Sequence, residues 1–208
     1  MRKLVLATDN KNKINEIKDI LSDLPIEILS KDQIGLEDLK VIEDGKTLVD
    51  NSLKKAREIA KYTDYLVVAD DTGLFVEKLD GKPGVYSSRY AGEDGNDKKN
   101  VELLLKNLEG EESRAYFETV ICLITEDKKE YIASGRCCGK VLTTIRGENG
   151  FGYDPIFQPD GFDRTFAELG SKQKNEISHR RKAIENLREI LIQLLGEKDE
   201  NTSSKWYA

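Results

Sequence analysis

The start of the chain alternates between strand-like and helix-like patterns of apolar residues. Residues 3–7 form a short apolar run, which predicts a strand, and apolar residues recur at helical spacing from Ile14 to Leu24, which predicts a helix. Pro25 ends this helix, and residues 26–29 predict a second strand. The chain therefore opens with a βαβ-like unit.

The next helix and strand carry clearer signals. Thr47 and Asp50 have the spacing of a capping box, and the apolar residues after them predict a helix from about Leu48 to Tyr62. The apolar run from Tyr65 to Ala69 predicts a buried strand. We expect this strand to place the pair Asp70-Asp71 at its carboxyl end, where open α/β sheets usually bind ligands.

The rest of the pattern predicts a helix, a hairpin and a long final helix. A loop-rich stretch precedes a helix over residues 101–108. Residues 115–125 and 130–138 predict two antiparallel strands joined by a polar turn. Glycines then mark an irregular loop at 147–152, and the last helix is expected from about Ser178 to Leu195.

Length and charge exclude several classes of protein. A chain of 208 residues can bury one substantial core, so we expect one domain over residues 1–196 and a mobile polar tail over 197–208. The net charge of −6 argues against a nucleic-acid-binding protein, which would show a clustered basic excess. No window approaches a membrane span, and we do not expect the residues near Met1 to be a signal peptide, because the apolar run from Leu4 to Ala7 is too short.

The cysteines indicate a reducing compartment. Cys122, Cys137 and Cys138 are odd in number and lack the C-x-x-C spacing of a zinc site or redox pair. Reduced thiols in a cytoplasmic protein are the expected state.

A candidate anion site lies where the first strand meets the first helix. Thr8, Asn10 and Lys13 supply a hydroxyl, an amide and an ammonium beside the free backbone N–H groups of the helix start. The alternative is a helix cap with a solvated lysine. The Walker pattern for phosphate binding is absent.

The adjacent carboxylates Asp70 and Asp71 are candidates for chemistry. Neighbouring side chains of a strand point to opposite faces, so one carboxylate can face a cleft as metal ligand and base while the other braces the loop. Glu43 can supply a second oxygen ligand of the kind that Mg²⁺ prefers. The alternatives are a simple turn at the aspartates and a surface glutamate.

Two further segments suit nucleotide recognition. Phe151 and Tyr153, with Asp154, follow a glycine-rich loop, and their flat rings can stack on a nucleobase. His179 and Arg180 begin the final helix after a serine N-cap. The alternatives are core aromatic residues, a structural histidine and a solvated arginine.

These motifs and their order define a specific pattern over residues 3–195. The segments are Ala7-Thr8-x-Asn10-x-x-Lys13, Glu43-x-Gly45, Asp50-Asn51 with Lys55-Ala56, Ala69-Asp70-Asp71-Thr72-Gly73-Leu74, Pro83-Gly84-Val85-Tyr86-Ser87-Ser88-Arg89-Tyr90, Phe151-Gly152-Tyr153-Asp154-Pro155-Ile156-Phe157, Ala167-Glu168-Leu169, and Lys174 ahead of Ile177-Ser178-His179-Arg180. The pattern resembles the inosine triphosphate pyrophosphatase family of house-cleaning nucleotide hydrolases. Thr72 stands where serine is usual and keeps the hydroxyl.

The resemblance implies a fold, a cofactor and an assembly. The fold would be α/β, with an elongated mixed sheet forming two lobes flanked by helices and the active site in the cleft between them. The protein would be a homodimer. Glu43 and Asp71 would bind Mg²⁺, with Mn²⁺ as an open alternative, and Asp71 would also act as the catalytic base.

The resemblance also implies a set of residues that bind the nucleotide. The triphosphate would contact the loop and helix start formed by Thr8, Asp9, Asn10, Lys11, Asn12 and Lys13. The rest of the nucleotide-binding set would be Lys55, Thr72, Phe151, Gly152, Tyr153, Asp154, Lys174, His179 and Arg180.

The implied activity is hydrolysis of the triphosphates of inosine, deoxyinosine and xanthosine to the monophosphate and pyrophosphate. One alternative is a Maf-like pyrophosphatase that acts on pyrimidine or modified nucleotides. Another is a nucleotide sensor that does not hydrolyse its ligand. A sensor would need a broken carboxylate set, whereas Glu43, Asp70 and Asp71 are all present.

Overall fold

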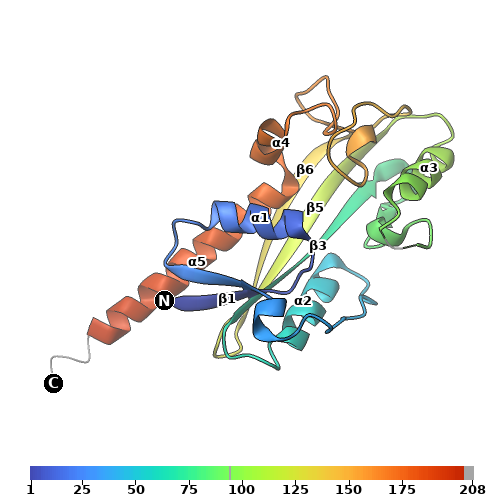
Figure 1. Cartoon of the computed structure of the whole chain (residues 1–208). Helices are drawn as coiled ribbons and strands as arrows, with labels where there is room; N and C mark the ends of the chain where they lie inside the picture. Colours follow the sequence, from blue (N-terminus) through green and yellow to red (C-terminus); the bar gives the residue numbers. More distant parts are fainter. Residues whose placement is uncertain (94, 204–208) are drawn as a thin grey trace.

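The computed structural model describes residues 1–93 and 95–203, and gives only the backbone of Asn12, Ser171 and residues 197–203. Figure 1 shows the strands in one long, twisted sheet with the helices around it. The strands are β1 (Arg2–Leu6), β2 (Ile26–Ser30), β3 (Leu66–Val76), β4 (Pro83–Gly84), β5 (Ser113–Ile124), β6 (Glu130–Val141) and β7 (Phe157–Pro159). The α-helices are α1 (Lys11–Ile20), α2 (Leu48–Ile59), α3 (Asp97–Asn107), α4 (Ser171–Ile177) and α5 (His179–Ser203).

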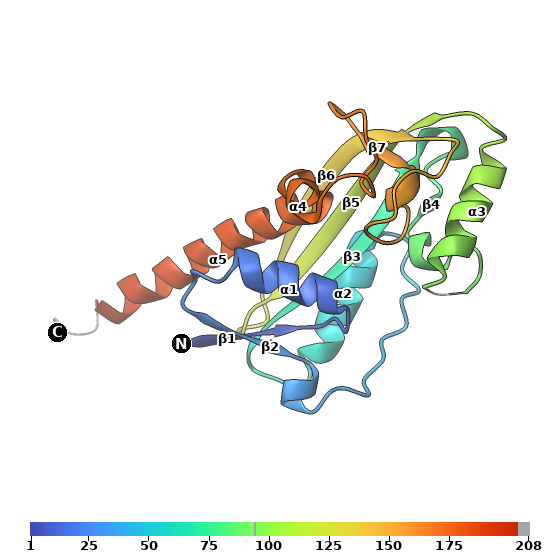
Figure 2. The same cartoon turned by 45° about the horizontal axis from the view of Figure 1, so that its top comes forward.

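The sheet is mixed, as predicted. Its order is β2-β1-β3-β5-β6-β7, and β4 pairs with β3 beside this path. β1 is parallel to β2 and β3, which confirms the βαβ opening, whereas β3, β5 and β6 form an antiparallel meander. Both views show these three long strands running from the part of the sheet near β1 and β2 toward α3, and Figure 2 labels β7 at that far end (Figures 1 and 2).

Alternation along the strands separates two hydrophobic clusters. Leu66 and Val68 of β3 pack in one cluster with residues of α1 and α5, while Val67 and Ala69 pack in the other with residues of α2. Successive side chains of a strand point to opposite faces, so helices cover the sheet on both sides. Figure 1 shows α1 and α5 on one side and α2 on the other.

The far end of the long strands has its own cluster. Leu74 and Phe117 pack there with Leu104 of α3 and with Phe157 and Phe166. Phe117 meets the ring of Phe157 edge-on, with 4.8 Å between the centroids. The cavity described below lies between this end and the parallel strands.

Several local predictions are confirmed. Thr47 accepts from the backbone N–H of Asp50, and the Asp50 side chain accepts from the backbone of Thr47, which completes the predicted capping box. β5 and β6 form the predicted hairpin, which closes at the pair Ile124 and Glu130. Ser178 caps the final helix, because its hydroxyl accepts from the backbone N–H of Arg181.

The end of β3 and the end of the last helix differ most from the sequence prediction. Asp70-Asp71 does not end its strand, because β3 continues to Val76 in register with β5, and the alternative of a simple turn at this pair is also wrong. The last helix continues to Ser203 rather than ending near Leu195. Residues 204–208 of the predicted tail lie outside the described residues, so its mobility stays a prediction.

Membrane insertion by a helix was not expected. Among the described residues, every helix is too short or too polar to cross a bilayer.

Candidate active site

The site lies at a gap along one edge of β3. On this edge, β1 pairs with β3 up to Val68, and β4 pairs with it again from Leu74. The backbone N–H of Ala7 still reaches the carbonyl of Val68, at 2.8 Å. Residues 70–73 then have no strand beside them on this edge, while β5 pairs with them on the other edge. Asp71 and Thr72 therefore open onto a cavity of about 800 Å³ although they sit within a strand.

The two aspartates point to opposite faces, as predicted from the strand period. Asp70 is 3% exposed, and its Oδ2 lies 2.6 Å from the Nζ of Lys13 on the α1 side. Burial is the largest single influence on the pKa of Asp70 and acts to raise it. The charges of Lys13, Lys55 and Arg180 together outweigh burial, so they hold this pKa below its ordinary value. Asp70 is thus a fixed anion that holds Lys13 of the predicted phosphate-binding segment.

Asp71 faces α2 and has different surroundings. Its Oδ2 accepts from the Nδ2 of Asn51 at 3.0 Å, and its Oδ1 accepts from the backbone N–H of Thr72 at 3.0 Å. Burial raises the pKa of Asp71; the charge of Glu43 raises it further, while Lys55 opposes the shift. Neighbouring carboxylates whose pKa values are pushed apart are suited to different roles.

Glu43 lies on an irregular strap, residues 35–46, that joins η1 (Asp32–Ile34) to α2. The Nη2 of Arg89 donates to the Glu43 carbonyl at 2.7 Å, and the Nζ of Lys31 donates to the Leu39 carbonyl at 3.1 Å. Two cations therefore hold the strap.

Asn51 ties the end of the strap to Asp71. Its Oδ1 accepts from the backbone N–H of Gly45 at 2.8 Å, while its Nδ2 holds Asp71. A Cβ on Gly45 would lie 2.6 Å from Asn51 Oδ1, so the motif needs glycine at this position. The strap thereby brings Glu43 and Asp71 to the same side of the cavity.

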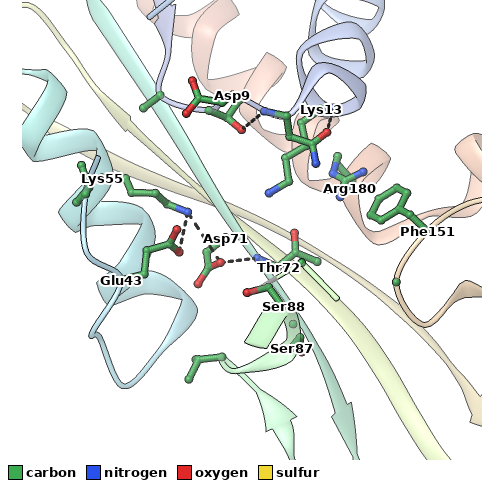
Figure 3. A pocket seen from close by; sticks show the side chains of 18 of the residues that line it. Asp9, Lys13, Glu43, Lys55, Asp71, Thr72, Ser87, Ser88, Phe151 and Arg180 are labelled. Atoms are coloured by element: carbon green, nitrogen blue, oxygen red, sulfur yellow. Dashed lines mark hydrogen bonds and ion pairs between the residues drawn. The ribbon is translucent and has the colours of Figure 1, made fainter. Parts of the chain in front are cut away.

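Glu43 and Asp71 converge on one cation. The Nζ of Lys55 lies 2.9 Å from Glu43 Oε2 and 3.9 Å from Asp71 Oδ1 (Figure 3). No group of three or more His, Cys, Asp or Glu within the described residues could hold a metal ion. Two carboxylates still fit Mg²⁺, which commonly takes its remaining oxygens from substrate phosphates and water.

The predicted phosphate segment has the expected polar contacts. The side chain of Asn10 accepts from the backbone N–H of Lys13 at 3.2 Å, and the Thr8 hydroxyl accepts from the backbone N–H of Asn10 at 3.3 Å. Asp9 forms an ion pair with the buried Lys31 at 2.8 Å. Figure 3 shows Lys13 and Arg180 across the cavity from Glu43 and Lys55.

In the loop of residues 151–154, one ring lies at the cavity, and the other side chains contact the protein itself. Phe151 is 39% exposed at the cavity, under the cations of Lys174 and Arg180 at 4.7 and 5.5 Å from its centroid. The carboxylate of Asp154 accepts from the Phe151 backbone N–H at 2.9 Å and pairs with Lys174 at 2.5 Å. The hydroxyl of the buried Tyr153 donates to the Ser87 carbonyl. Of the two rings at the cavity, Tyr153 is buried and Phe151 is therefore the more exposed.

His179 and Arg180 form the wall behind this ring. His179 is buried and stacks on Phe117, with 4.7 Å between the centroids. Its Nδ1 and the Nε of Arg180 are buried polar atoms without a hydrogen-bond partner in the described part of the chain. Arg180 also pairs through Nη1 with Glu16 at 2.9 Å. Unmatched polar atoms beside a cavity can serve a ligand.

Most of the predicted site residues line this one cavity. They are Thr8, Asp9, Asn10, Lys13, Glu43, Lys55, Asp71, Thr72, Phe151, Gly152, Tyr153, Asp154, His179 and Arg180. Lys11 and Lys174 are not among the lining residues, and the side chain of Asn12 lies outside the described residues.

Some lining residues carried no functional prediction. Lys31, Ser88 and Asp97 line the cavity, and Asp97 accepts from the backbone N–H of Gly152 at 2.7 Å. Ser88 stood in a matching motif, so the resemblance could have indicated it. Lys31 and Asp97 had no local signal, because the contacts that place them join distant parts of the chain.

The buried His179 predicts a pH dependence of stability. Burial, followed by the charges of Arg180, Lys174, Lys13 and Lys182, holds the pKa of His179 well below its ordinary value. The unfolded chain therefore binds a proton that the folded chain excludes, so this contribution to stability is lost as pH falls below about 6.5.

His179→Phe keeps a ring against Phe117 and removes the titration. From pH 7 to pH 5.5 the wild type should lose roughly 1 kcal/mol more of its free energy of unfolding than this variant, measured by urea denaturation. Equal losses would contradict a neutral buried histidine.

Known proteins closely similar to this chain share a name. A protein named dITP/XTP pyrophosphatase from Clostridium perfringens is 47% identical over 94% of this chain and 100% of its own length. A protein of the same name from Caldanaerobacter subterraneus is 46% identical over 95% of this chain and 100% of its own length.

Solved structures agree with the fold. A HAM1 protein from Coxiella burnetii superposes with a TM-score of 0.86 at 39% identity, covering 93% of this chain and 100% of that one. A nucleoside-triphosphatase / dITP/XTP pyrophosphatase from Mycobacterium abscessus gives a TM-score of 0.75 at 38% identity, covering 89% and 98%. The model of the Ham1 family matches residues 4–190, which confirms the resemblance found in the motifs. The chain belongs to the Ham1 family.

Proposed function

We propose that this protein hydrolyses the triphosphates of inosine, deoxyinosine and xanthosine to the monophosphate and pyrophosphate. The observation that carries the proposal is one cavity that is lined by three cations, Lys13, Lys55 and Arg180, and by the carboxylates of Glu43 and Asp71, which lie near Lys55. The relatives named dITP/XTP pyrophosphatase support the substrate class. An intact carboxylate set speaks against a sensor that only binds.

The charge of the substrate decides what the cations do. A triphosphate carries several negative charges, so catalysis of phosphoryl transfer consists largely of neutralising and aligning it. Lys13 extends from the start of α1, where free N–H groups also favour an anion. Lys55 approaches from α2 on the other side of the cavity. The two ammonium groups can hold the chain of phosphates between them.

Asp71 is proposed as the base. It takes a proton from a water that attacks the α-phosphorus, the bond to the bridging oxygen breaks, and pyrophosphate leaves with that oxygen. Its raised pKa makes Asp71 a stronger base than an ordinary aspartate, and Asn51 holds its direction. Asp70 is unsuited to this role because Lys13 binds it on the opposite face.

We further propose that the reaction requires Mg²⁺. Glu43 and Asp71 would hold the ion with oxygen ligands. When bound, Mg²⁺ would neutralise phosphate charge that Lys13 and Lys55 leave unbalanced.

The test is a pyrophosphate-release assay with the triphosphates of inosine, deoxyinosine and xanthosine, in Mg²⁺ and after exhaustive EDTA treatment. We expect turnover to monophosphate and pyrophosphate in Mg²⁺, loss of turnover with EDTA, and recovery when Mg²⁺ is restored. Release of inorganic phosphate instead of pyrophosphate would refute the proposed reaction. Turnover that survives EDTA would refute the metal requirement alone.

A further inference from the structure

Two threonine hydroxyls on adjacent strands contact each other beside the cavity. Thr72 of β3 and Thr119 of β5 are direct partners in the antiparallel ladder, and their Oγ1 atoms lie 2.8 Å apart. Thr72 lines the cavity beside Asp71, as Figure 3 shows, whereas Thr119 is 0% exposed. One hydroxyl of the pair therefore meets the ligand and the other meets only protein.

Burial indicates which of the two oxygens is the donor. Within residues 1–93 and 95–203, the Thr119 hydroxyl has no hydrogen-bond partner except Thr72. A hydroxyl has one hydrogen to donate, and a buried hydrogen without an acceptor is costly. Thr119 can satisfy its hydrogen only by donating to Thr72. The hydrogen of Thr72 is then not used within the pair.

We propose that Thr119 is a positioning residue that commits the Thr72 hydroxyl to donate into the cavity, to an acceptor oxygen of the bound nucleotide. Thr72 is held on its other side as well, because its backbone N–H donates to Asp71 at 3.0 Å. The donor is thus fixed one residue from the proposed base. This inference rests on the proposed function, since it needs a nucleotide in this cavity.

The direction of the bond predicts an asymmetry in stability without any ligand. Thr72→Val removes the only acceptor for a fully buried hydrogen, so we expect the unfolding equilibrium constant to rise ~10-fold. Thr119→Val leaves Thr72 at the cavity, where water can replace its partner, so the rise should be smaller. In the Thr72→Val background, Thr119→Val should restore stability, because it removes the stranded hydroxyl. If Thr119→Val alone stabilises the protein, the assigned direction is wrong.

The second readout is the kinetics with inosine triphosphate. Thr119→Val should raise KM about 5- to 10-fold and leave kcat within about 2-fold, because a lost binding hydrogen bond is worth roughly this factor. Thr119→Ser keeps the hydroxyl and should restore the wild-type KM. In the Thr72→Val background, Thr119→Val should cost no further activity. An equal loss in both backgrounds would overturn the proposal, because Thr119 would then act independently of Thr72.

Inhibition by inorganic tripolyphosphate locates the acceptor. This probe has neither sugar nor base, so weaker inhibition of the Thr119→Val variant assigns the acceptor to a phosphate oxygen. Unchanged inhibition together with the raised KM assigns the acceptor to the sugar or base. Both results agree with donation by the Thr72 hydroxyl into the cavity. Absence of wild-type turnover would refute the proposed function, whereas the stability series tests the direction of the bond separately.

Discussion

Replacing Asp71 by Asn is expected to lower kcat at least ~100-fold, the lower range for loss of a group that moves a proton in the transition state. Asn keeps the size of the side chain, and its one oxygen can still accept from either Asn51 or the backbone N–H of Thr72, so the fold should persist. The measurement is steady-state pyrophosphate release, with circular dichroism and thermal unfolding to show that the variant is folded. A folded variant that turns over at nearly the wild-type rate would mean that Asp71 is not the base.

Asp70→Asn is the matched control, since the two residues are neighbours on one strand. Asp70 is buried against Lys13, so the variant should lose up to ~3 kcal/mol of stability as the ion pair is broken. An Asp70 variant with an unchanged melting temperature and no turnover would reverse the roles of the two carboxylates.

The second large effect concerns the choice of base. Adenosine triphosphate should be turned over with a kcat/KM up to ~10⁴-fold below that of inosine triphosphate. Hypoxanthine presents a carbonyl acceptor at C6, whereas adenine presents an amino donor there. Within the described residues, the buried Nε of Arg180 is a donor without a partner, and His179 lies beside it. A carbonyl at C6 can accept from this donor, whereas the amino group of adenine leaves it unpaired.

Arg180→Ala tests the proposed reading of the base. It should reduce kcat/KM for inosine triphosphate far more than for adenosine triphosphate and so narrow the ratio between them. Glu16→Gln is a suitable control, because it removes the charge that pairs with Arg180 Nη1 and leaves the guanidinium in place. Equal losses for both nucleotides in Arg180→Ala would assign Arg180 to the phosphates or ribose.

The sequence predicted the parts of the fold that local rules control. The capping box at Thr47, the hairpin of β5 and β6, and the opposite faces of Asp70 and Asp71 all follow from spacing and period. The residues of the candidate site were found through the order of the motifs, because Thr8, Glu43 and Arg180 are far apart in sequence and meet only in the folded chain.

What the sequence missed depends on pairing between distant segments. The strand before Asp70 was expected to end there because the polar residues break its apolar run. β5 instead supplies a partner as far as Val76, so the ladder continues through a polar stretch. The role of Lys31 was equally hidden, since it holds the Leu39 carbonyl and Asp9 through contacts that no periodicity indicates.

The place of α5 has a consequence for the order in which this protein can assemble. Ala183 and Leu187 of α5 complete the hydrophobic cluster that contains Leu4 and Leu6 of β1, and β1 leads directly into the segment from Thr8 to Lys13. A ribosome releases α5 after every strand of the sheet, so during most of synthesis only α1 is present to cover part of this face of β1. The β5 and β6 hairpin pairs neighbouring residues and can form early. The segment from Thr8 to Lys13 should therefore become fully ordered late, once the final helix has left the ribosome and docked.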